Sequence, residues 1–133
     1  MSRPFNVREI IGALTGETAK ILQEDAVAAM SAVTLATPVG NPTLWQNPER
    51  APDGYVGGHA RRSWIASVGR PSDERPPPDD VDPNGARTIG EAVAEIRTYG
   101  RRDALAGRPI FIQNGAPYIE ALNDGSSTQA PVN

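Results

Sequence analysis

The sequence predicts a single domain of the α+β class, in which a long N-terminal helix and a second helix pack on a small antiparallel sheet. Apolar residues recur at helical spacing over residues 6–36 and again over residues 88–99. Short runs rich in β-branched and aromatic residues occupy 61–69 and 110–112. With 133 residues, the chain (1–133) is long enough for one domain with a modest core.

The first predicted helix runs from about Asn6 to Ala36. Its apolar stripe begins with large side chains and continues with shorter ones: Val7, Ile10, Ile11, Leu14, Thr18, Leu22, Ala26, Ala29, Met30 and Val33. Gly12 and Gly16 each cost up to about 1 kcal/mol of helix stability relative to alanine, so the sequence suggests a break in the helix near residues 15–17. Two interpretations of the stripe stay open: packing on the core of this chain, or contact with another subunit.

A proline-rich insertion follows this helix. Pro38 is expected to end the helix, because proline lacks a backbone donor and does not fit a helix interior. The insertion, residues 40–58, has too many prolines and glycines to be a regular element. Solvated linkers rarely carry aromatic residues. Trp45 and Tyr55 therefore indicate an ordered insertion that docks on this subunit or on the next one.

A second long loop, residues 70–87, combines three consecutive prolines with five acidic residues. The prolines favour extended geometry, and the acidic residues keep the segment solvated. This loop is interpreted either as a mobile surface loop or as an arm that becomes ordered along a neighbouring subunit.

The predicted strands lie before and after the second helix. Arg61 to Gly69 alternates weakly between apolar and polar residues, and Trp64 within it is expected in the core. Thr88 and Glu91 match a capping box at the start of the second helix, and Gly100 is expected to end it. The apolar face of that helix is Ile89, Ala92, Val93, Ile96 and Tyr99.

The C-terminal stretch reads as strand, turn and short helix. The strand at residues 110–112 is followed by the turn signal Asn114-Gly115. Pro117 is suited to open a helical turn that carries Tyr118, because its missing N–H would have no partner there. An extended stretch with Gln129 and Pro131 follows.

The composition favours a protein that associates with copies of itself. Leu, Ile, Val and Phe total 26, about a fifth of the chain, which is few for a self-sufficient core. The net charge of −3 is too small to prevent folding and unlike the basic charge of dedicated DNA-binding domains. The sequence has no cysteine, signal peptide or apolar run long enough to cross a membrane. We therefore expect cytoplasmic synthesis and an oligomer.

No catalytic or metal-binding pattern stands out, and the sequence predicts neither an enzyme nor a cofactor. His59 is the single histidine, and no nucleophile elbow or zinc-ligand spacing accompanies it. The acidic residues of the second loop lack the spacing of a calcium loop and are interpreted as solvated: Asp73, Glu74, Asp79, Asp80 and Asp82.

Two arginine pairs, Arg61-Arg62 and Arg101-Arg102, are the remaining candidates for a functional role. They can form ion pairs within or between subunits, or they can contact DNA phosphates in a channel. Consecutive side chains of a strand face opposite ways, so Arg61 and Arg62 cannot both point into one channel if a strand includes both. Arg101 and Arg102 are expected near the C-terminus of the second helix, where its dipole favours cations.

Two stretches resemble one known family. Asn114, Pro117-Tyr118, Leu122, Gly125-Ser126 and Gln129-Ala130-Pro131 are similar to the C-terminal signature of tailed-phage neck and tail-completion proteins, the HK97 gp10-like family. That family's first motif is similar to Thr37-Pro38-Val39 followed later by Gly58-His59-Ala60-Arg61-Arg62-Ser63-Trp64. This sequence departs from the pattern after Val39, where Gly40-Asn41 replaces Asp-Thr and a long insertion separates the two halves.

The resemblance implies a structural virion subunit at the head-to-tail junction, assembled in the host cytoplasm. Copies would form a ring, a hexamer or a dodecamer, between the portal or connector and the tail-tube or tail-sheath proteins. Genomic DNA would pass through the lumen without sequence recognition. Connector, stopper and tail-terminator roles all stay open. The alternatives are a small DNA-binding or DNA-processing protein that uses the paired arginines, and an unrelated interaction module.

Overall fold

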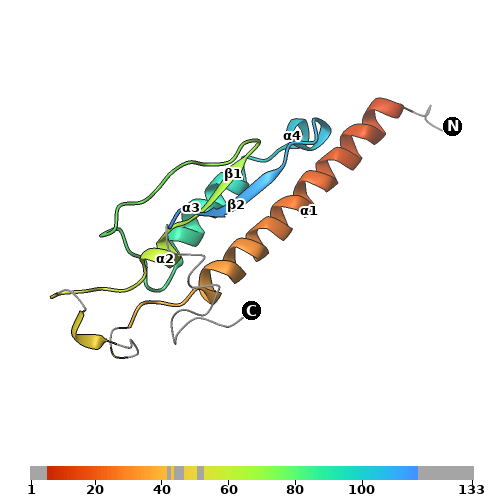
Figure 1. Cartoon of the computed structure of the whole chain (residues 1–133). Helices are drawn as coiled ribbons and strands as arrows, with labels where there is room; N and C mark the ends of the chain where they lie inside the picture. Colours follow the sequence, from red (N-terminus) through yellow and green to blue (C-terminus); the bar gives the residue numbers. More distant parts are fainter. Residues whose placement is uncertain (1–5, 42, 44–46, 51–52, 117–133) are drawn as a thin grey trace.

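The computed structural model describes residues 6–41, 43, 47–50 and 53–116. In that part of the chain the elements follow in the order α1 (Val7–Ala36), η2 (Pro48–Arg50), α2 (His59–Arg62), β1 (Trp64–Val68), α3 (Ala86–Ile96), α4 (Arg101–Leu105) and β2 (Ile110–Asn114). β1 and β2 form a two-stranded antiparallel sheet, and α1 and α3 pack against it (Figure 1). The predicted α+β class is confirmed.

α1 is one continuous helix, so the suggested break near residues 15–17 is wrong. The side chain of Asn6 accepts hydrogen bonds from the backbone N–H groups of Arg8 and Glu9 and thereby caps the first turn. Gly16 lies where α4 crosses the helix: an added Cβ there would lie only 3.0 Å from Nε of Arg101. The small residue permits this close approach, and the packing of α3 and α4 along α1 outweighs the low helix propensity of glycine.

The strand predicted from Arg61 begins later, because residues 59–62 form the short helix α2. Gly58 enables this turn with a φ of 112°, and an added Cβ there would lie 2.7 Å from the backbone nitrogen of Pro83. The carbonyl of Gly58 accepts from the N–H of Arg62, and Ser63 ends the turn by donating to His59. Arg61 and Arg62 therefore lie on a helical turn and not on a strand.

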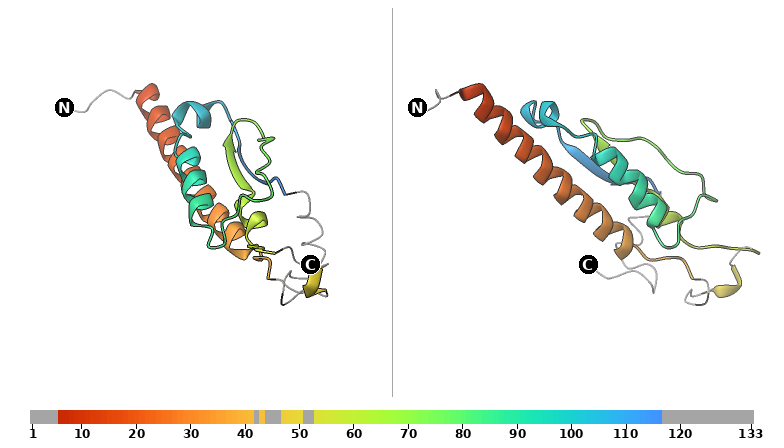
Figure 2. Two further views of the ribbon diagram at one scale, coloured as in Figure 1. Left: turned by 90° about the vertical axis from the view of Figure 1, so that its left-hand side faces the viewer. Right: turned by 180° about the vertical axis from the view of Figure 1, so that it is seen from behind.

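The sheet presents one face to the helices. β1 and β2 pair in the register Trp64↔Asn114, Ala66↔Ile112 and Val68↔Ile110. The residues of this face meet α1 and α3 in a small core formed by Ala26, Met30, Ala66, Ala92 and Ile96, with Val27, Trp64, Ile110 and Ile112 packed against it. Figure 2 shows α1 and α3 alongside the two strands from two further directions. Trp64, which was predicted in the core, packs against this cluster and is half-buried.

α3 starts and ends earlier than the sequence indicated. Thr88 is not its N-cap: the helix begins at Ala86 after Gly85, whose φ is 77°. The carboxylate of Asp82 accepts from the N–H of Thr88 at 2.7 Å and takes the role that the capping box assigned to a side chain within the helix. The helix ends at Ile96, and Gly100 caps α4 instead. Arg101 and Arg102 thus belong to the short helix α4 and not to the C-terminal end of α3.

The loop before α3 lies against its own chain. The side chain of Gln113 accepts from the N–H of Ser72 at 2.7 Å. Gly115 passes so close to this loop that an added Cβ would lie 2.6 Å from the carbonyl oxygen of Glu74. The loop is therefore anchored on the sheet, which agrees with neither a free loop nor an arm that only a neighbouring subunit orders. Within the described residues, no helix is both apolar and long enough to cross a membrane.

Candidate functional site

α1 carries its smallest apolar residues on the side that faces the core. This inner face consists of Ala19, Ala26, Met30 and Thr34, all buried. Met30 alone is large, and it is fully buried against the sheet and α3. Small side chains allow close approach of the neighbouring elements, but each contributes little apolar area to the core. The inner face therefore permits close packing but adds little hydrophobic stabilisation to the core.

The large aliphatic residues of α1 lie on the opposite side and are exposed. This outer face consists of Val7, Ile10, Ile11, Leu14, Ile21, Leu22 and Leu35. Leu14 is 62% exposed, Val7 55% and Ile21 53%. Figure 1 shows that the N-terminal end of α1 extends past α4, where no other described element covers it. A row of large exposed aliphatic side chains is a typical feature of protein–protein contact surfaces.

Part of the outer face forms one apolar row: Val7, Leu14, Ile21, Ala28 and Leu35 recur at every seventh position. A coiled-coil seam needs apolar residues at a second position of each heptad. Three residues beyond each of the first four members of the row lie Ile10, Glu17, Glu24 and Ser31, so the row is narrower than a coiled-coil seam. The predicted single stripe was wrong in joining Val7, Ile10, Ile11 and Leu14 to the buried alanines. The seven-residue repeat is the sequence signal that separates the two faces.

Arg61 holds three segments of the chain together. Its guanidinium donates to the backbone carbonyls of Thr37 (3.1 Å from Nε and 2.9 Å from one terminal nitrogen), Leu35 (2.9 Å) and Pro83 (2.8 Å). Two of these carbonyls belong to the C-terminal end of α1, where a positive charge also complements the helix dipole. Because its donors are directed at the backbone of this chain, Arg61 is engaged in the fold.

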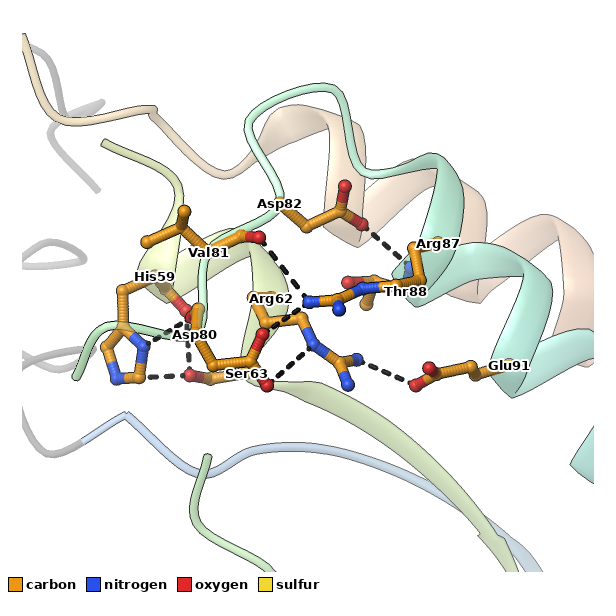
Figure 3. Close-up of polar contacts among 9 residues, drawn as sticks. All are labelled: His59, Arg62, Ser63, Asp80, Val81, Asp82, Arg87, Thr88 and Glu91. Carbon is orange, nitrogen blue, oxygen red and sulfur yellow. Dashed lines mark hydrogen bonds and ion pairs between the residues drawn. The ribbon is translucent and has the colours of Figure 1, made fainter. Parts of the chain in front are cut away.

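Arg62 lies in an ion-pair cluster between α2, α3 and the second loop (Figure 3). Its Nε is 3.1 Å from Oδ2 of Asp80, and a terminal nitrogen is 2.8 Å from Oε2 of Glu91. Asp80 also accepts from Arg87 of α3. The ion pairs of Arg62 are therefore within the chain, and Asp80 is a structural residue where a merely solvated one was predicted.

The ion-pair cluster changes the pKa values of Asp80 and Arg62. Partial burial alone would raise the pKa of Asp80, but the hydrogen bond from Arg87 and the charge of Arg62 hold that pKa below its ordinary value of 3.8. Burial alone would lower the pKa of Arg62, but Glu91 and Asp80 raise it above its ordinary value. Both shifts favour the charged forms, so the cluster stays ionised at neutral pH.

Arg101 and Arg102 differ from the first pair because they are exposed. Neither forms an ion pair with any residue that the structure describes. Arg101 lies across Gly16 of α1 and lines a shallow hollow between α1 and α4. These two guanidinium groups are thus available to an external partner.

The two halves of the first motif meet in space. The indole N–H of Trp64 donates to Oγ1 of Thr37 at 2.7 Å, across 27 sequence positions. Pro38 follows Thr37, which is the C-cap of α1, so the predicted end of the helix is correct. The Oγ1 of Thr37 in turn donates to the carbonyl of Val33 at 2.7 Å. The contact ties the end of α1 to the start of β1.

The remaining predicted site residues divide between described and undescribed parts of the chain. Tyr55 is 39% exposed, and its hydroxyl group lies against Gly40, so that a side chain at that glycine would collide with it. This contact brings the two ends of the insertion together. Trp45, Tyr118, Gln129 and Pro131, together with the predicted short helix after Pro117, lie outside the described residues.

His59 has a structural place. Its Nδ1 is 3.0 Å from the carbonyl oxygen of Asp80, which joins α2 to the second loop. The buried Ser63 donates its hydroxyl to the carbonyl of His59 at 2.7 Å. Among the described residues, no group of three or more His, Cys, Asp or Glu side chains is arranged to hold a metal ion.

Comparison with known proteins does not add a relative. No protein-family model, curated protein or solved structure matches this chain.

Proposed function

We propose that this protein is a structural subunit of the head-to-tail interface of a tailed bacteriophage and forms a ring that joins the portal or connector to the tail. Identical subunits in head-to-tail contact generate a ring when the rotation between neighbours closes. The subunit acts through assembly, without catalytic turnover and without a cofactor, and DNA passes through the lumen. Its place of action is the neck of the virion.

The outer face of α1 is the observation that carries this proposal. Four of its large aliphatic side chains are more than half exposed while alanines fill the core. Each large aliphatic side chain contributes about 1.5–3 kcal/mol when it is removed from water. Contact with a neighbouring subunit would remove these side chains from water, whereas they stay exposed in the isolated chain.

The motif contact supports the family assignment within the proposal. Thr37 and Trp64 stand in the two halves of the motif that resembles the neck family, and they share a hydrogen bond. Arg61, in the second of these two stretches, donates to the carbonyl of Thr37 as well. The contact gives Thr37 and Trp64 a structural role, which is to hold the end of α1 against the start of β1.

The charge of the chain suits a conduit for DNA. The formal net charge is −3, so a ring of copies would not hold DNA through a strongly basic surface. Arg61 and Arg62 are occupied by contacts within the chain, which leaves Arg101 and Arg102 as the exposed pair. This arrangement weakens the alternative of a dedicated DNA-binding protein, which needs several free cations on one face.

Light scattering coupled to size-exclusion chromatography, with negative-stain imaging of the peak, tests the proposal. The protein should elute as a closed oligomer and show rings. Leu14→Glu combined with Ile21→Glu should give a folded monomer, because charged side chains on the outer face oppose burial while glutamate maintains the helix. Ala94→Glu, which places the same charge at an exposed position of α3, is the matched control and should still assemble.

Two results would overturn the proposal. One is a wild-type protein that remains monomeric at high concentration and does not bind connector or tail-tube proteins. The other is a double variant that assembles as well as the wild type, which would show that the outer face of α1 is not the contact. Unchanged far-ultraviolet circular dichroism in both variants is required for either comparison.

A further inference from the structure

The edge of β1 that faces away from β2 has free backbone groups. The hydrogen bonds at the two ends of the β1–β2 ladder show which residues bond across it. The N–H of Gly115 donates to the carbonyl of Ser63 at 3.0 Å, and the N–H of Gly69 donates to the carbonyl of Pro109 at 2.8 Å. In an antiparallel pair the bonding residues alternate. Ile65 and Ser67 therefore direct their backbone groups at β2, whereas those of Ala66 and Val68 point the other way. No described residue pairs with them there.

A groove of about 300 Å³ runs beside this free edge. Its wall on one side is α3, with Thr88, Glu91, Ala92 and Glu95. Its wall on the other side is the second loop, with Ser72, Glu74 and Pro76. Residues of β1 from both faces of the sheet line it, so it lies where one more strand would extend the sheet. We refer to it as the edge groove.

The edge groove is acidic. Glu74, Glu91 and Glu95 line it, and the single cation of the lining, Arg62, is already paired with Glu91 and Asp80. Within the described part of the chain, the carboxylates of Glu74 and Glu95 form no ion pair. A positively charged side chain would therefore be attracted into the groove.

We propose that the edge groove binds an extended segment of another protein, which pairs with β1 as a third strand and places a lysine or arginine between Glu74 and Glu95. Addition of a strand to an exposed sheet edge gives affinity through the main chain and specificity through alternate side chains. The proposal depends on the geometry of this edge and not on the proposed neck function.

A second copy of this chain is a poor occupant. Its described cations lie in helices, in the turn that ends α3, in ion pairs or beside prolines that lack a backbone donor, as Arg70 does beside Pro71 and Arg75 beside Pro76. None of them offers an extended basic strand. The occupant is therefore a different protein with a basic residue in an extended segment.

Amide hydrogen exchange followed by nuclear magnetic resonance tests this inference on the whole protein. The probe is a blocked peptide of sequence Thr-Lys-Val-Arg-Val-Thr, and the control peptide has glutamate in place of both basic residues. On addition of the probe, exchange at the amides of Ala66 and Val68 should slow about tenfold or more, because they enter a ladder. The amides of Ile65 and Ser67, already in the ladder, should change little.

Charge variants identify the side-chain contribution. Glu95→Lys should weaken binding of the probe about fivefold, whereas Asp53→Lys, the same change at an exposed loop position, should not. The double variant Glu74→Lys with Glu95→Lys should prefer the glutamate peptide. Absence of protection at millimolar probe overturns the inference. Protection of Ala66 and Val68 before any peptide is added also overturns it, because this chain or a second copy would then fill the edge.

Discussion

Replacement of Arg61 by alanine should destabilise the fold by about 2–3 kcal/mol. Arg61 donates four hydrogen bonds to the carbonyls of Leu35, Thr37 and Pro83. A hydrogen bond from a charged donor contributes about 1.5–3 kcal/mol, but the contributions of one side chain do not add. Because the contacts are partly exposed, water can replace some of them, which places the expected loss at the size of one to two such bonds.

Urea unfolding at one fixed protein concentration measures this effect. With a slope of about 1–1.5 kcal/mol/M, a loss of this size lowers the midpoint by about 2 M. Arg102→Ala is the matched control: this side chain is exposed and forms no ion pair in the described structure, so its midpoint should shift by less than about 0.5 M. Equal midpoints for Arg61→Ala and the wild type would refute the assignment of Arg61 to the fold and would return it to the candidates for DNA contact.

Three further predictions concern the core and its polar contacts. A double-mutant cycle of Thr37→Val and Trp64→Phe should give a coupling of about 1 kcal/mol in chemical unfolding, and additive losses would mean that the 2.7 Å bond contributes nothing. The pKa of Asp80 is lowered in the folded protein, so the stability that its carboxylate contributes is present above pH 3.8 and is lost as the pH falls through the pKa of the folded state. Asp80→Asn should therefore reduce the pH dependence of the free energy of unfolding in this acidic range. An unchanged pH dependence would contradict this prediction. Met30→Ala should cost about 2–5 kcal/mol because Met30 is fully buried, whereas Met30→Leu should cost less than about 1.5 kcal/mol; equal losses would contradict a packed site.

The long helix and the second strand follow from local patterns in the sequence. Asn6 and Pro38 mark the two ends of α1, and both act through nearby backbone. The strand at residues 110–112 has a short β-branched and aromatic run, which is a local signal as well. Such features need no knowledge of the rest of the chain, and the structure agrees with them.

The misses arise where distant residues decide the local structure. Thr88 matches a capping box, yet Asp82 caps the helix from the preceding loop and shifts its start to Ala86. Gly58 turns the chain into α2 because the loop at Pro83 passes against it, a contact that no local pattern shows. The arginine pairs were indistinguishable in sequence, and only the positions of their partners separate Arg61 and Arg62 from the exposed pair.

The faces of α1 were not separated in the sequence because both are apolar. Helical periodicity detects one apolar side against a polar one, and an apolar residue on each side reduces that contrast. The buried positions of α1 are Ala19, Ala26, Met30 and Thr34, whereas seven of its large aliphatic residues are exposed. The row with seven-residue spacing, and not the 3.6-residue period alone, was the informative sequence pattern.

The opposed faces of α1 have a genetic consequence. Under the proposed ring assembly, damage to the buried alanines removes the protomer, whereas damage to the exposed aliphatic row leaves a folded protomer that cannot make one of its two contacts. In a closed ring each protomer gives one surface and receives another. A half-competent protomer would still be received by its wild-type neighbour and would end the growing arc. Substitutions that unfold the protomer should therefore be recessive, and substitutions in the exposed aliphatic row should be dominant because they block assembly of the wild-type copies.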